Sequence, residues 1–80
     1  MPKLKALSGS DVVKIFEDFG FVVIARKGSH IKLRRTVNGV RQTLTIPDHR
    51  DLDKGTLRAI CSQAAKYAPE ADLHGRFYTE

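Results

Sequence analysis

The segment from His30 to Ile46 constrains the fold more than any other part of this chain. Apolar and polar side chains alternate along it, and Asn38-Gly39 stands at its centre. This dipeptide is the commonest signal for a two-residue type I′ hairpin, because both central residues must adopt positive φ. Counting outward from the turn pairs Val37 with Val40, and the same register then fixes every other pair of the hairpin.

The hairpin register predicts two different faces. Leu33 lies opposite Leu44 and Ile31 lies opposite Ile46, so the apolar pairs, with Val37 and Val40, share one face that we expect to form the core. The opposite face carries a polar row. This row consists of His30, Lys32 and Arg34 on the first strand and Thr43 and Thr45 on the second.

The flanking segments predict helices and one more strand. Apolar residues recur at helical spacing from about residue 9 to 19, after the capping residue Ser8, with Asp11 as its capping-box partner and Gly20 as the stop. A strand is expected over Phe21 to Arg26. Asp51 or Asp53 caps a second helix, which carries Leu57, Ile60, Cys61, Ala64 and Ala68 at helical spacing and is closed by Pro69.

These elements predict an α+β fold in the order α-β-β-β-α. The three strands form an antiparallel sheet, and both helices must pack on one face to bury their apolar stripes, which leaves the other face open to solvent. We expect a single domain over residues 1–68. Residues 69–80 show no clear period and are expected to form a C-terminal tail, from which Phe77 and Tyr78 dock on the domain or on a partner.

Size and charge narrow the class of ligand. A chain of 80 residues has no room for a deep cavity, so its chemistry is expected on an open surface that suits a polymer. Lys and Arg outnumber Asp and Glu by 14 to 9, and the net charge of +5 favours a polyanionic partner. The sequence has no signal-peptide pattern and no apolar run of membrane-spanning length, so we expect a cytoplasmic protein without a membrane partner.

Positive charge is concentrated on the expected sheet. No acidic residue occurs between Phe19 and Asp48. Basic residues on an exposed hairpin also prevent aggregation of strand edges, but a surface of mixed sign would serve that purpose equally well. The uniform sign therefore favours phosphate binding, with Arg26, Lys27, Lys32 and Arg34 as the candidate side chains.

His30 is the candidate catalytic residue of this row. Imidazole can accept a proton from a ribose 2′-hydroxyl or give one to a leaving 5′-oxygen, and this cleavage needs no metal because the 2′-hydroxyl is an internal nucleophile. The neighbouring cations would stabilise the charge of the transition state. Taken from the residues alone, a surface histidine is more often solvated than catalytic.

The remaining candidate groups give weaker signals. His49 is either a second acid or base or a residue that fixes its loop by a hydrogen bond, and His74 is expected to be solvated. Cys61 is expected to be a small core residue rather than a reactive thiol. The histidines, the cysteine and the acids match no metal-binding spacing, and no phosphate-cradling glycine motif is present, so no metal or cofactor is expected.

Four motifs in order along residues 7 to 66 resemble the HicA family of toxin ribonucleases. They are Gly20-Phe21, Lys27-Gly28-Ser29-His30, Thr45-Ile46-Pro47-Asp48-His49 and Lys54-Gly55-Thr56-Leu57-Arg58-Ala59-Ile60. The resemblance implies a fold like the double-stranded-RNA-binding domain. It also implies an endoribonuclease, or mRNA interferase, that cleaves messenger RNA and is inhibited by a cognate HicB-type antitoxin.

The resemblance assigns the catalytic role to His30, because the family's histidine is the one in Gly-Ser-His. Beside it, we infer that Gly28 lets the RNA backbone approach and that Ser29 offers a hydroxyl or amide to phosphate. One position departs from the pattern: many relatives have an arginine where this chain has Ala25. If Ala25 points to the core, we expect Arg26 to replace the missing charge from a neighbouring position; the alternative is a lower affinity for RNA.

Two other functions fit parts of the same pattern. A non-catalytic RNA-binding module would keep the fold and the basic face, and would bind RNA without cleaving it. A structural protein that binds only a protein partner would show no salt-dependent affinity for RNA, which fits least well with a sheet that lacks acidic residues.

Overall fold

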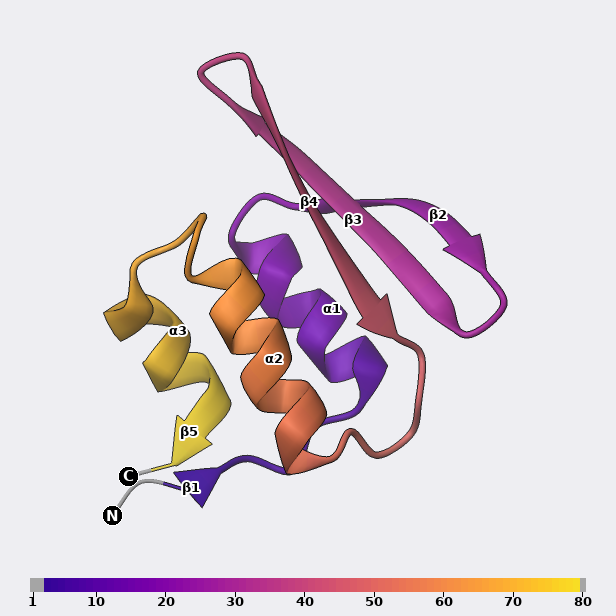
Figure 1. Ribbon diagram of the computed structural model, residues 1–80, viewed down its shortest axis with the longest axis vertical. Helices are drawn as coiled ribbons and strands as arrows, with labels where there is room; N and C mark the ends of the chain where they lie inside the picture. Colours follow the sequence, from indigo (N-terminus) through magenta and orange to yellow (C-terminus); the bar gives the residue numbers. More distant parts are fainter. Residues whose placement is uncertain (1–2, 80) are drawn as a thin grey trace.

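Two helices cover one face of a three-stranded antiparallel sheet, and a third helix packs beside the second (Figure 1). The structure is a computed structural model that describes residues 3–79; Met1, Pro2 and Glu80, which the expected domain and tail include, lie outside this part. The elements are β1 (Lys3–Leu4), α1 (Gly9–Asp18), β2 (Val22–Lys27), β3 (His30–Val37), β4 (Val40–Pro47), α2 (Lys54–Ala64), α3 (Glu70–Phe77) and β5 (Tyr78–Thr79). The predicted α+β class, with its α-β-β-β-α order and its antiparallel sheet, is confirmed, and β1, α3 and β5 are additions to it.

The start and end of α1 follow the sequence signals. The Ser8 hydroxyl accepts a hydrogen bond from the backbone N–H of Asp11 at 3.0 Å, and the Asp11 carboxylate accepts one from the N–H of Ser8 at 2.9 Å. This reciprocal pair is the predicted capping box. Gly20 then adopts φ +93°, a left-handed conformation that turns the chain into β2.

The sheet has the order β2-β3-β4 and the predicted hairpin register. Val37 pairs with Val40, and the turn residues Asn38 and Gly39 have φ values of 51° and 78°, as a type I′ turn requires. One detail of the expected core face is wrong. The Val37 and Val40 pair stays 39% and 61% exposed, because the hairpin extends beyond the helices that bury the other pairs (Figure 1).

The core lies between the sheet and the helices. Phe16 of α1 is fully buried and contacts Phe21 and Phe77, each with a ring-centroid distance of 5.8 Å. The other large, fully buried side chains come from both helices and from the inner face of the hairpin. They are Val12, Leu57, Ile31, Leu33, Leu44 and Ile46.

The second helix ends earlier than predicted. Asp53 caps α2 as expected, since its carboxylate accepts a hydrogen bond from the Thr56 N–H at 2.6 Å, but the helix stops at Ala64 instead of running to Pro69. Pro69 instead stands at the start of α3, where a proline is tolerated because the first N–H groups of a helix have no intrahelical acceptor. Ala68 is still buried, although it belongs to the turn between the helices.

The segment after Pro69 is a helix rather than a tail without regular structure. Leu73 and Phe77 lie four residues apart on one side of α3 and are 2% and 0% exposed, so this segment belongs to the same core. Acidic residues occur in the first turn and basic residues in the last turn, in the order that the helix dipole favours. The short apolar pattern of only two large side chains explains why periodicity did not reveal this helix.

The two ends of the described chain are paired. β1 and β5 form a two-stranded antiparallel sheet in which Lys3 lies opposite Thr79 and Leu4 opposite Tyr78. The N–H of Lys5 also donates to the carbonyl of Phe77 at 2.8 Å. Within residues 3–79, no helix has the length and apolar character that crossing a membrane requires.

Candidate active site on the open face of the sheet

His30 stands at the beginning of β3 with its side chain exposed. It lies between Lys27 of β2 and Pro47 of β4 in the register, so the three strands place it at one end of the sheet. The turn that leads to it contains Gly28 at φ +59°, a backbone conformation in which a side chain would be strained. His30 is therefore the first residue after the tight turn that Gly28 and Ser29 form.

The predicted polar row is present on the face that the helices leave open. Lys32 lies opposite Thr45, and Arg34 lies opposite Thr43, so these side chains share one face with His30 and Lys27. A depression of about 450 Å³ occupies the end of this face. It is lined by Ala25, Lys27, His30, Lys32 and Thr45.

A β-bulge in β2 decides which side chains reach this depression. The pairing of β2 with β3 shifts between Val23 and Ala25, so Ile24 is an extra residue. Ala25 therefore lies opposite Lys32 on the open face, and the condition that it points to the core is not met. Arg26 falls opposite Ile31 instead, on the helix side of the sheet edge, where its guanidinium lies 3.8 Å from the carboxylate of Asp48.

The loop after β4 is tied to the turn before His30. The N–H of Asp48 donates to the carbonyl of Ser29 at 2.6 Å, so the carbonyl of Ser29 is already engaged. The carbonyl of His49 accepts a hydrogen bond from Gly9 at 2.8 Å, and a Cβ at Gly9 would collide with the carbonyl oxygen of Pro47. This backbone contact fixes the loop, while the exposed imidazole of His49 makes no hydrogen bond within residues 3–79.

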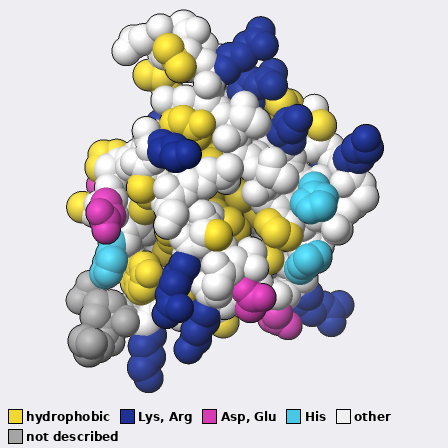
Figure 2. Space-filling model, in the orientation of Figure 1, with side chains coloured by type: hydrophobic (Ala, Val, Ile, Leu, Met, Phe, Trp, Pro, Cys, Tyr) yellow, Lys and Arg dark blue, Asp and Glu magenta, His cyan; other side chains and the backbone are white. Residues whose placement is uncertain are grey.

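The electrostatics of the open face are uniformly positive. The ion pairs within residues 3–79 are those of Arg26 with Asp48 and of Arg76 with Asp18, which leaves Lys27, Lys32 and Arg34 without an ion-pair partner there. The Nε of Arg34 is also buried without a hydrogen-bond acceptor. Figure 2 shows Lys and Arg side chains over the protruding hairpin with no acidic side chain beside them.

Arg35 has a structural role that the distribution of charge along the sequence did not predict. It belongs to the acid-free stretch, but it lies on the face of the sheet that carries Leu33 and Val37, so it points toward the helices. Its guanidinium donates to Phe19 O at 2.6 Å, to Tyr67 O at 2.5 Å and to Gln42 Oε1 at 2.5 Å. The register already contained the signal, because an arginine at an inward position needs internal acceptors.

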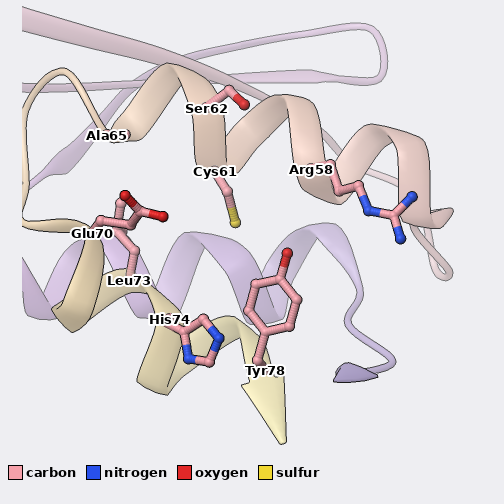
Figure 3. Close-up of a pocket in the computed structure, with 8 residues that line it drawn as sticks. All are labelled: Arg58, Cys61, Ser62, Ala65, Glu70, Leu73, His74 and Tyr78. Atoms are coloured by element: carbon pink, nitrogen blue, oxygen red, sulfur yellow. The ribbon is translucent and has the colours of Figure 1, made fainter. Parts of the chain in front are cut away.

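A second hollow, of about 490 Å³, lies between α2 and α3 on another part of the molecule (Figure 3). His74 lies there, and its ring stacks on that of Tyr78 with centroids 4.5 Å apart, so it is not simply solvated. Cys61 is half-buried against the core, and this burial raises the pKa of its thiol and disfavours the reactive thiolate. Among the described residues, no three His, Cys, Asp or Glu side chains gather in a group that could hold a metal ion.

Comparison with known proteins gives one family assignment. Residues 9–65, more than half of the chain, match the family model described as the HicA toxin of bacterial toxin–antitoxin systems. Comparisons with curated proteins and with solved structures gave no significant match. The matched region begins with α1 and ends just after α2, so it contains the whole sheet and the open face.

Proposed function

The chain belongs to the HicA toxin family of bacterial toxin–antitoxin systems, and on this premise we propose that it is a metal-independent endoribonuclease that cleaves messenger RNA at His30. The observation that supports the proposal most directly is the position of His30. Its exposed imidazole stands at the end of a row of Lys and Arg side chains that have no acidic partner within residues 3–79. A polyanion can reach this face, because none of the three described helices covers it (Figure 1).

The proposed reaction is an internal transfer at phosphorus. The 2′-oxygen of the substrate attacks the adjacent phosphorus, the bond to the 5′-oxygen breaks, and the products carry a 2′,3′-cyclic phosphate and a 5′-hydroxyl. His30 accepts the proton of the 2′-hydroxyl or donates one to the 5′-oxygen, and water or His49 makes the other transfer. Lys27 and Lys32 lie beside His30 and stabilise the added negative charge on the phosphoryl oxygens.

The other predicted RNA contacts differ in what supports them. Arg34 and Lys32 extend the row along β3, and Gly28 leaves the backbone open to a close approach. Ser29 keeps both its hydroxyl and its backbone amide as proposed phosphate contacts, since within residues 3–79 its carbonyl alone is engaged, by the Asp48 N–H. Arg26 lies at the sheet edge on the side of Asp48, so we propose that it contributes to the positive field rather than to the surface beside His30.

Substitution of His30 by alanine tests the catalytic assignment. The side chain is exposed, so His30→Ala should keep the melting temperature while the cleavage rate falls by about 10²- to 10⁴-fold, the usual contribution of a general acid or base. The assay measures cleavage of a labelled RNA in excess chelator and identifies the product ends. His74→Ala is the matched control, because His74 lies on α3 and should leave the rate unchanged.

Three results would contradict this assignment. They are a folded His30→Ala variant that cuts at the parent rate, an absolute need for added magnesium, and cleavage of DNA that lacks the 2′-hydroxyl. RNA binding without cleavage at any protein concentration would favour the non-catalytic RNA-binding module instead.

Membership of the family implies a partner antitoxin. We propose that this partner is a HicB-type protein and that it inhibits by covering the open face with acidic side chains that meet Lys27, Lys32 and Arg34. The fold alters the expected apolar part of this contact. Phe77 is fully buried and cannot take part, and the Tyr78 ring is stacked on His74. The exposed Val22 and Ile24 of β2 line one hollow with Arg34, so we propose that they add apolar contacts to the partner.

A further inference from the structure

The hairpin formed by β3 and β4 extends past the helices, and its outer part carries a cation that the predicted site does not include. Thr36 pairs with Arg41 near the turn, and both side chains are exposed. The register places this pair on the same face as Arg34 and His30. The basic row beside His30 therefore continues to the outer end of the hairpin.

The spacing along this face matches a nucleic-acid strand. Side chains on one face of a strand recur every second residue, or about 6.6 Å, which is comparable with the distance between adjacent phosphates of a nucleic-acid strand. His30, Lys32, Arg34 and the Thr36–Arg41 pair occupy successive positions of this kind. The row from His30 to Arg41 therefore spans about 20 Å along the strand.

Nothing else in the described part of the chain engages the outer cation. The ion pairs found within residues 3–79 involve Arg26 and Arg76, so Arg41 has no acidic partner there. Solubility alone would be served by charges of either sign, but the whole hairpin lacks Asp and Glu. The hydroxyls of Thr43 and Thr45 lie directly across from Arg34 and Lys32 on the same face and add hydrogen-bond donors for phosphate oxygens.

The hairpin is also held at a fixed position relative to His30. Arg35, next to Arg34, donates hydrogen bonds to the carbonyls of Phe19 and Tyr67 and packs over the Phe21 ring at 4.8 Å. These contacts fasten the point where the hairpin leaves the helices to the end of α1 and to the turn after α2. A ligand on the outer part is thus placed at a defined distance from the imidazole.

We propose that the open face of the hairpin is a track for one RNA strand, with Arg41 as its outer phosphate contact. This inference rests on the proposed ribonuclease function and adds a substrate requirement to it. The nucleotides on one side of the cut run from His30 along Lys32 and Arg34 to Arg41. The substrate must then extend about three nucleotides beyond the cut on that side, one for each step along the face.

A binding measurement tests the outer contact without cleavage. In a His30→Ala background, the affinity for a labelled single-stranded RNA longer than the track is measured at several salt concentrations. Arg41→Ala should weaken binding by about fivefold or more at low salt and reduce the slope of log affinity against log salt by about 0.7, the value for one phosphate contact on a single strand. Lys14→Ala removes a charge from the exposed side of α1 and should change neither quantity.

A cleavage measurement with intact His30 tests the direction and length of the track. The substrates are DNA strands with a single ribonucleotide, which fixes the cut bond, and either flank is lengthened from one to six nucleotides of mixed sequence. The parent and Lys14→Ala should cut faster as one flank grows to about three nucleotides, with no gain from the other flank. Arg41→Ala should lose that gain.

The two measurements separate failure of the track from failure of the ribonuclease proposal. An Arg41→Ala variant with unchanged salt slope and unchanged flank dependence would refute the proposed RNA track. The outer hairpin would then be a candidate contact for a protein partner instead. A parent protein that cuts neither the chimeras nor RNA would end the ribonuclease proposal, while the salt slope would still decide whether Arg41 contacts RNA.

Discussion

Arg35 shows how one guanidinium can serve as a structural connection between three parts of a small domain. It is half-buried and joins β3 to β4 through Gln42, to the end of α1 through Phe19 and to the turn after α2 through Tyr67. Both backbone carbonyls would lose their partner if the side chain were shortened. The planar fork of arginine suits this arrangement, whereas lysine has a single nitrogen to share among the acceptors.

We expect Arg35→Ala to lower the free energy of unfolding by about 2–4 kcal/mol, because charge-assisted hydrogen bonds to internal acceptors are lost together. Arg35→Lys should recover only part of the loss. Urea unfolding measures both, and Arg41→Ala serves as the control, since it removes an exposed arginine from the same hairpin. Equal stability of the Arg35→Ala and Arg41→Ala variants would show that the three hydrogen bonds contribute little.

Among the elements, the two main helices begin with carboxylates whose titration should be visible in stability. The backbone N–H of Thr56 lowers the pKa of Asp53 below its ordinary value, and the backbone N–H of Ser8 does the same for Asp11. A carboxyl group with a lowered pKa in the folded protein stabilises it above the pKa of the unfolded chain. That contribution disappears as the pH falls through the lowered pKa.

Asp53→Ala should therefore be less stable than the parent at neutral pH, and the difference should shrink as the pH falls below the usual range of aspartate. Thermal melts across that range measure the effect. Asp51→Ala is the matched control from the same loop, because Asp51 makes no hydrogen bond within residues 3–79. A stability difference for Asp53→Ala that stays constant down to low pH would mean that the charge of the cap is irrelevant.

The elements also show how far the sequence determines this fold. Local signals that involve few residues were sufficient for α1, for the register of β3 and β4, and for the Asp53 cap. Alternation along β2 could not predict the bulge at Ile24. This one inserted residue moves Ala25 and Arg26 each to the face opposite the one that regular alternation from Val23 would give it. The position of His30 on the open face followed from the hairpin register. The face on which each residue of β2 lies could be assigned only from the three-dimensional structure.

At the scale of the whole molecule, the helices pack on one face of the sheet and the positive charge is concentrated on the other. The helices and the core lie on one side (Figure 1), and the register places the row of cations, which have no ion-pair partner within residues 3–79, on the other. Under the proposed function, RNA and an inhibiting antitoxin would compete for one surface. Complementary charge would accelerate the association of either ligand, and added salt would weaken this effect.

Reversal of charge at Lys32 and Arg34 should weaken the binding of both ligands. The double substitution Lys32→Glu and Arg34→Glu, made in a His30→Ala background, should lower RNA affinity at least tenfold at low salt, because two phosphate contacts become repulsive. Titration with the cognate antitoxin should show a parallel loss. Full retention of antitoxin affinity beside a loss of RNA binding would place the antitoxin on another surface and refute inhibition by occlusion.

The pairing of β1 with β5 places the two ends of the described chain side by side. Because Lys3 and Thr79 face each other, a short peptide linker could join the two ends of the described chain without moving either strand. New ends could then be opened at Asn38 and Gly39, where the turn is exposed and remote from the core. Such a circular permutant would leave every helix and strand uncut and would break only the turn between β3 and β4, so the outer hairpin would become a pair of free strand ends.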